Sequence, residues 1–129
     1  MKQTLSKTER LCGRPRIRHV LEQGRRFHIP PLRVSWVITP YTGPAVSIVF
    51  SVPKSRFRHA VDRNLLKRRM REAYRTQKAD LAGWAAENGL HLDVILSYNG
   101  REISDSREIR EKIILILQRL RVACEKTAG

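Results

Sequence analysis

Apolar residues recur at helical spacing near the start of the chain. Ile17, Val20 and Leu21 lie three or four residues apart, after Pro15 and before Gly24. Proline suits the first turn of a helix and glycine suits its C-terminal stop. The pattern therefore predicts a first helix between these two residues.

Three strand-like segments follow. Residues 27–29 end at two prolines, residues 32–38 partly alternate and are rich in β-branched side chains, and residues 45–52 form an uncharged apolar run. Such a run indicates burial on both faces of a sheet. Because the turn cluster at residues 40–44 joins the last two segments, we expect them to form an antiparallel pair.

Residues 60–79 have the pattern of a two-sided helix. At about 100° per residue, Leu66, Met70, Ala73 and Tyr74 fall on one side. The opposite side, here called the cationic face, carries Asn64, Lys67, Arg68, Arg71, Arg75 and Lys78. Solvated helix faces usually mix charges of both signs, whereas the acids of this helix are Asp62 and Glu72. The pattern favours a surface that meets a polyanion.

The rest of the chain completes a mixed pattern. Residues 84–87 prolong or follow the second helix, and residues 90–98 read as a strand. Ser104 or Ser106 is expected to cap a last helix, whose apolar stripe consists of Ile109, Ile113, Ile116, Leu117 and Leu120. The predicted order is α-β-β-β-α-β-α, an α/β class single-domain α-β sandwich over residues 1–129. Residues 1–13 are polar and basic, and we expect a flexible arm there.

The charge is strongly positive and unevenly distributed. The 129 residues carry 26 Lys and Arg against 12 Asp and Glu, a formal net charge of +14. The basic excess is confined to residues 1–33 and 54–78, whereas residues 34–53 are uncharged and residues 79–129 are nearly balanced. Self-repulsion on this scale destabilises a fold unless a polyanion is its partner, and solubility rarely requires it. A nucleic acid is therefore the expected partner.

Other features point to a cytoplasmic protein. No apolar run approaches the ~20 residues that span a bilayer, and the basic first 30 residues do not resemble a secretory signal. Cys12 and Cys124 lack metal-ligand spacing. We expect two free thiols in a reducing compartment.

The second helix also carries a family resemblance. Residues 60–75, AVDRNLLKRRMREAYR, resemble the Arg-Asn-Arg helix of the bacterial ribonuclease P protein family. Residues 51–54 (SVPK) resemble the strand end that leads into that helix, and residues 10–11 and 21–25 resemble parts of the family's first helix. The resemblance spans roughly residues 5–120 and is strongest over residues 51–75.

This resemblance implies a fold, a function and site residues. It implies a left-handed βαβ crossover, which is unusual, and a non-catalytic protein that assists tRNA 5′ maturation. The partner RNA subunit would hold Mg²⁺ and perform the endonucleolytic reaction. The residues implied to face that RNA are Arg63, Asn64, Lys67, Arg68 and Arg71, to which the cationic face adds Arg75. The residues implied near a cleft for the 5′ leader of precursor tRNA are Ile17, Leu21, Val34, Trp36 and Lys54.

Two departures from the family pattern bear on these roles. Leu65 stands where the family has a second arginine, so one RNA contact is lost while the cationic face persists. Ile17 and Leu21 stand where aromatics are frequent, and aliphatic side chains do not supply the ~1–3 kcal/mol per base of aromatic stacking. Trp36 compensates if it faces the cleft, but burial in the core is equally compatible with the sequence.

A catalytic site within the polypeptide is not expected. Asp62 and Glu72 lie nearly three helical turns apart, about 15 Å, which is too far to share a metal ion. The sequence has scattered histidines and no phosphate-binding glycine loop. A general structured-RNA-binding or ribosome-associated protein is the main alternative, followed by a metal-dependent nuclease and a membrane-surface protein. We expect neither a membrane nor an obligate protein partner.

Overall fold

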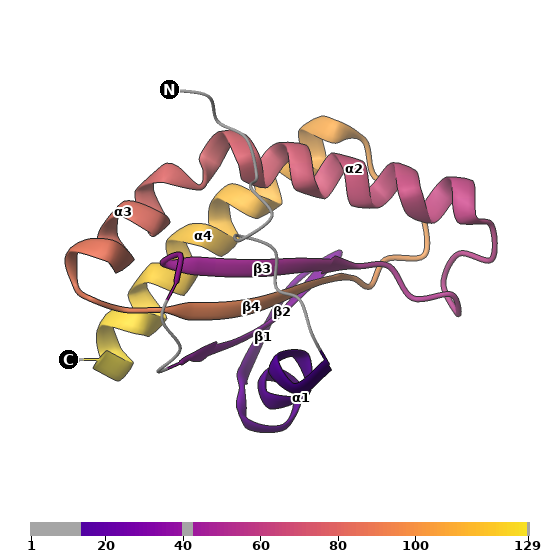
Figure 1. The fold of residues 1–129 in the computed structure, drawn as a ribbon. Coiled ribbons are helices and arrows are strands. Elements are labelled where there is room, and N and C mark those ends of the chain that lie inside the picture. The colour runs from indigo at the N-terminus through magenta and orange to yellow at the C-terminus, as the bar shows by residue number, and fades with distance from the viewer. Residues whose placement is uncertain (1–13, 40–42, 129) are drawn as a thin grey trace.

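The described part of the chain forms four helices and four strands (Figure 1). The computed structural model describes residues 14–39 and 43–128. The predicted arm and residues 40–42 of the predicted turn lie outside the described residues. The elements are α1 Arg14–Gln23, β1 Arg25–Ile29, β2 Leu32–Ile38, β3 Val46–Ser51, α2 Ala60–Gln77, α3 Ala79–Glu87, β4 Leu92–Tyr98 and α4 Ser106–Ala128. The predicted mixed α/β class is confirmed. Residues 84–87 belong to a separate helix, α3, which only Lys78 separates from α2.

The four strands form one sheet in the order β1-β2-β4-β3. β1 pairs with β2 and β2 pairs with β4 in antiparallel fashion, whereas β3 pairs with β4 in parallel. The predicted antiparallel pairing of residues 32–38 with residues 45–52 is therefore wrong. β4, which lies between β2 and β3, is buried over almost its whole length. A strand buried on both faces favours such a central position in a sheet. The parallel pair makes β3-α2-α3-β4 a βαβ crossover, whose handedness stays a prediction.

The helices cover the two faces of the sheet unequally. In Figure 1, α2, α3 and α4 lie on one face and α1 lies on the other. Because side chains of a strand alternate between faces, β2 contributes Val34 and Trp36 to the larger core under α2 and α4. Val37 instead joins the smaller cluster around Val20 of α1 and Ile95 of β4. The sheet is thus the middle layer of three.

The apolar side of α2 anchors that helix on the larger core. Its buried residues are Leu66, Met70, Ala73 and Tyr74, as the helical periodicity predicted. Tyr74 also meets Phe50 of β3 edge-on, with ring centroids 6.0 Å apart. Burial of each large apolar side chain contributes about 1.5–3 kcal/mol. The orientation of α2 is therefore fixed, and its opposite side is directed to solvent.

The end of α1 requires a glycine. The Gly24 amide donates a hydrogen bond to the Val20 carbonyl oxygen over 2.8 Å, closing the last turn. A Cβ atom at Gly24 would lie 2.3 Å from that oxygen and 3.0 Å from the Trp36 carbonyl oxygen. Both contacts are with backbone atoms, so a side chain does not fit. Gly24 lets α1 pass directly into β1.

A polar network orders the connection from β4 to α4. The Tyr98 hydroxyl donates to the Glu102 carbonyl oxygen over 2.5 Å and accepts from the Ser104 amide over 3.0 Å. Asp105 then caps α4, because its Oδ1 accepts a hydrogen bond from the Glu108 amide over 2.8 Å. The prediction of Ser104 or Ser106 as the cap is therefore wrong. A carboxylate satisfies the first-turn amides and also suits the positive end of the helix.

Candidate nucleic-acid interface

The cationic face of α2 lies on the surface of the molecule. Asn64, Arg68 and Arg71 are exposed and Lys67 is half-buried. With Val61 and Leu65, these four residues line a shallow depression of about 540 Å³. Leu65, at the position where the family pattern has an arginine, is half-buried in the same depression. The depression therefore combines three cations and an amide with an apolar floor.

Two other arginines of α2 hold neighbouring loops. Arg63 donates from Nη1 to the carbonyl oxygens of Phe57 and Arg58, each over 2.8 Å. Arg69 donates from Nη1 to the Ser104 carbonyl oxygen over 2.6 Å. Arg63 therefore positions the segment that enters α2, and this is a structural task that the sequence analysis did not predict. Its two bonds use one of the two terminal guanidinium nitrogens.

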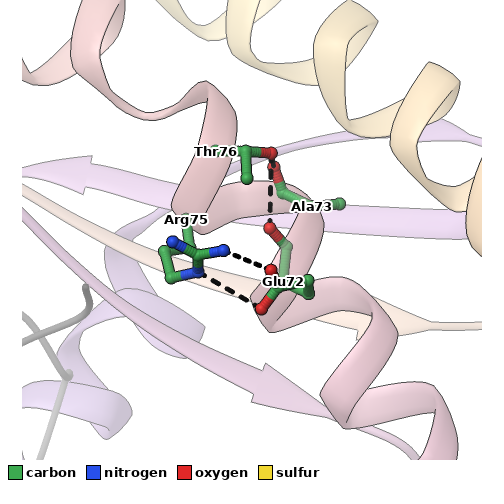
Figure 2. A network of polar contacts seen from close by, with 4 residues as sticks. All are labelled: Glu72, Ala73, Arg75 and Thr76. Carbon is green, nitrogen blue, oxygen red and sulfur yellow. Dashed lines mark hydrogen bonds and ion pairs between the residues drawn. The ribbon is translucent and has the colours of Figure 1, made fainter. Parts of the chain in front are cut away.

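Arg75 is paired within its own helix. Its Nη2 forms an ion pair with Glu72 Oε1, and its Nε donates to Glu72 Oε2 over 3.2 Å (Figure 2). This hydrogen bond raises the pKa of Arg75 and lowers the pKa of Glu72. The residue after Arg75 is Thr76, whose hydroxyl donates to the Ala73 carbonyl oxygen over 3.0 Å. Arg75 therefore offers an RNA less uncompensated charge than Arg68 or Arg71, because Glu72 partly compensates its charge inside the protein.

The structure separates the residues predicted near a cleft at α1. Ile17 packs in the smaller core cluster, Leu21 is 47% exposed, and Lys54 is exposed. Val34 and Trp36 lie in the larger core on the opposite face of the sheet, and Trp36 is 2% exposed. The predicted position of Val34 beside α1 is therefore wrong, and Trp36 takes the core position that the sequence left open. Along residues 32–36 of β2, apolar Leu32, Val34 and Trp36 alternate with polar Arg33 and Ser35. This alternation separates two sets of side chains but does not show which set faces α1.

The face of the sheet that carries α1 presents a row of polar residues. Ser51 pairs in register with Ser97, Ser97 with Arg33, and Arg33 with His28. Residues paired in this way point to the same face. The row, here called the polar row, thus crosses all four strands from β3 to β1. Arg33 and His28 are exposed, and the two serines are half-buried.

The acidic and histidine residues are dispersed. Within residues 14–39 and 43–128, no group of three or more His, Cys, Asp or Glu side chains is arranged to hold a metal ion. Cys124 is a free, buried thiol, and Cys12 lies outside the described residues. None of the described helices is long and apolar enough to cross a membrane.

Comparison with known proteins decides the family. The sequence profile of the Ribonuclease P family matches residues 5–121. The chain belongs to this family. Family membership makes it a protein component of ribonuclease P, which acts in tRNA 5′ maturation.

Relatives of the family agree with this assignment. The chain is 37% identical over 106 residues to the ribonuclease P protein component of Porphyromonas gingivalis, covering 81% of this chain and 77% of that protein. It is 39% identical over 87 residues to that of Chlorobium phaeobacteroides, covering 62% and 60% respectively. The ribonuclease P protein of Staphylococcus aureus has the same fold, with a TM-score of 0.72 at 18% identity, covering 88% of this chain and 96% of that one.

Proposed function

We propose that this ribonuclease P protein binds the catalytic RNA subunit through the cationic face of α2. The observation that carries the proposal is the two-sided placement of that helix. Leu66 and Met70 are fully buried while Arg68 and Arg71, one or two positions away, are exposed. Arginine presents a planar fork that matches phosphate oxygens, and structured RNA is recognised largely through its backbone and shape. A rigid helix bearing such groups suits an RNA partner.

The roles of the individual residues follow from their contacts. Lys67, Arg68 and Arg71 would make the principal phosphate contacts, with Asn64 as an uncharged hydrogen-bonding partner. Arg63 would contribute indirectly by holding residues 57–58, and Arg75 only when its pairing with Glu72 is relaxed.

The hydrolysis itself is assigned to the RNA partner. We propose that the RNA subunit holds the Mg²⁺ ions and performs the cleavage, while the protein supplies charge and positioning. Asp62 and Glu72 support this division, because ten residues along one helix separate them by about 15 Å. Carboxylates that share a metal pair must lie much closer than that. A cytoplasmic location for the assembled enzyme stays a prediction.

Precursor tRNA would be contacted on the other face of the sheet. We propose that its single-stranded 5′ leader lies along the polar row, beside the exposed side chain of Leu21 and near Lys54. Arg33 would contact phosphate, and the serine hydroxyls would accept or donate hydrogen bonds. This assignment replaces Val34 and Trp36 with the residues that alternate with them along β2. Ile17 would keep an indirect role, because it packs α1 against the sheet.

Reconstitution with the catalytic RNA from the same genome tests the proposal. The protein should lower the Mg²⁺ concentration that this RNA requires to cleave precursor tRNA, and the protein alone should not cleave. The double variant Arg68→Ala/Arg71→Ala should lose the stimulation, whereas Arg107→Ala/Arg110→Ala, which removes the same charge from exposed positions of α4, should keep it. No stimulation by the wild type, or cleavage by protein freed of RNA, would overturn the proposal. Equal affinity for unrelated structured RNAs would indicate a general RNA-binding protein instead.

A further inference from the structure

A second cationic surface lies between β1 and α4, on the helix-covered face of the sheet. A depression of about 290 Å³, here called the β1–α4 groove, is lined by Arg25, Arg26, Phe27, Trp36, Arg119, Val122, Ala123 and Lys126. The four cationic side chains are exposed, and Val122 is 49% exposed. No acidic residue is among those described as lining it.

The spacing of the residues explains how the groove forms. Arg119, Val122 and Lys126 recur at intervals of three and four, so they share the face of α4 that meets β1. Arg25 and Phe27 alternate with Arg26 and His28 along β1, and they point to the helix-covered side. Their registered partners, Trp36 and Val34, lie in the larger core and confirm this orientation. The cations therefore surround an aromatic and aliphatic floor.

Arg119 is held in place by that floor. Its guanidinium carbon lies 4.7 Å from the centroid of the Phe27 ring. This contact orients the guanidinium group without neutralising it, because the ring carries no net charge. A planar cation fixed on an aromatic ring can stack on an unpaired base while neighbouring cations bind phosphate. The chemistry fits a single-stranded polynucleotide.

The edge strand connects this groove to the polar row. β1 is the outermost strand, so its two faces meet at an open edge of the sheet. His28 ends the polar row on the α1 side. Arg26 is paired with Ser35 on that same side and also lines the groove. Arg25, the residue before Arg26, points to the helix-covered side of the sheet and begins the groove there. A strand of nucleotides crossing the sheet along the polar row would cover about 14 Å, three strand spacings, before it reaches this edge.

We infer that the β1–α4 groove binds the upstream nucleotides of the precursor's 5′ leader after they pass the edge of β1. This inference rests on the proposed function, since it extends the same leader beyond the polar row. In this arrangement Arg25 and Lys126 bind leader phosphates, and the Arg119 guanidinium on Phe27 provides a stacking surface. Base recognition by stacking is tolerant of sequence, so the groove senses leader length more than leader sequence.

Leader length provides the test. Binding of precursor tRNAs with leaders of about three and about twelve nucleotides is measured for the assembled enzyme over a range of salt concentrations. For the double variant Arg25→Ala/Lys126→Ala, the slope of log affinity against log salt should fall by about 1.4 with the long leader, about 0.7 per phosphate contact. Between 50 and 200 mM salt, the wild-type advantage over this variant should shrink roughly sevenfold. With the short leader the variant and the wild type should agree.

Three results distinguish failure of this inference from failure of the proposed function. Equal slopes for the variant and the wild type with the long leader would overturn the inference while leaving the proposed function intact. Equal losses with both leaders would place the groove against the catalytic RNA or the tRNA body, and would also overturn it. Failure of the wild-type protein to stimulate the catalytic RNA would remove the proposed function itself. Arg107→Ala/Arg110→Ala is the charge-matched control, since these residues lie about 18 and about 14 Å along α4 from Arg119.

Discussion

The buried carboxylate of Asp93 in β4 is paired with the guanidinium group of Arg16 in α1. Arg16 Nε donates to Asp93 Oδ2 over 3.2 Å, and Arg16 Nη2 pairs with Oδ1. The side chain of Asp93 is 1% exposed and that of Arg16 is 30% exposed. This pair ties the lone helix of one face to the central strand of the sheet.

Removal of the arginine should destabilise the fold. Arg16→Ala leaves a charged carboxylate buried without its partner, and we expect a loss of about 3 kcal/mol in the free energy of unfolding. Urea denaturation measures it. Arg18→Ala, at an exposed position of the same helix, should cost less than about 0.5 kcal/mol. Similar losses for the two variants would show that the pair does not hold α1.

The cationic face of α2 should determine the salt dependence of RNA binding. Arg68→Ala and Arg71→Ala should each lower the slope of log affinity against log salt by about 0.9, the value for one phosphate contact with a duplex. Filter binding to the catalytic RNA between 50 and 200 mM salt measures this slope. Unchanged slopes for both variants would exclude this face as the binding surface.

Glu72 should weaken RNA binding in the wild type. Glu72→Gln removes a negative charge from beside the cationic face and releases Arg75 from its ion pair. We expect a few-fold gain in affinity for the catalytic RNA and a steeper salt dependence. Glu111→Gln, which removes the partner of Arg107 on α4, is the matched control and should have no effect. An equal gain in RNA affinity for both variants would show that the net charge of the protein matters and the position of Glu72 does not.

The thiol of Cys124 should be unreactive in the folded protein. Burial raises its pKa from 9.0 to about 11, and the thiolate is the reactive species. In a Cys12→Ser background, a thiol reagent at pH 8 should modify Cys124 only after denaturation. Fast labelling of the native protein would contradict the buried position.

The same pKa shift predicts an alkaline loss of stability. Because the folded state holds the proton more tightly than the unfolded state, the stabilising contribution is complete below pH 9 and is lost as the pH rises toward 11. Cys124→Ala should flatten this part of the stability profile. Chemical denaturation across that pH range measures the effect.

Local patterns predicted the helices well and the pairing of strands poorly. The buried side of α2 followed from the spacing of Leu66, Met70 and Tyr74, because helical periodicity is encoded within a few turns. The position of β4 between β2 and β3 depends on contacts between residues that are far apart in the sequence, and a turn cluster cannot reveal them. Trp36 illustrates the same limit at the candidate site, because the alternation along β2 separates two sets of side chains without showing which set faces α1.

The intramolecular contacts of Arg63 and Arg75 were also not predicted from the sequence. Both belong to the basic segment, and charge alone does not distinguish a cation that meets solvent from one that bonds to a backbone carbonyl, as Arg63 does. For Arg75, the spacing of three residues from Glu72 was a signal that could have indicated the pair. The β1–α4 groove was missed for a related reason. Its cations come from residues 25–26 and 119–126, which only the folded chain brings together.

The central place of β4 has a consequence for synthesis of the protein on the ribosome. Neither β2 nor β3 has its main partner until residues 92–98 have been made, since both pair with β4. Because α2 lies within the crossover that β4 completes, its arginines emerge well before the sheet that orients them exists. A nascent chain should therefore display an unordered basic segment to any nearby RNA, and the synthesis of residues 92–98 determines when that segment acquires its selective shape.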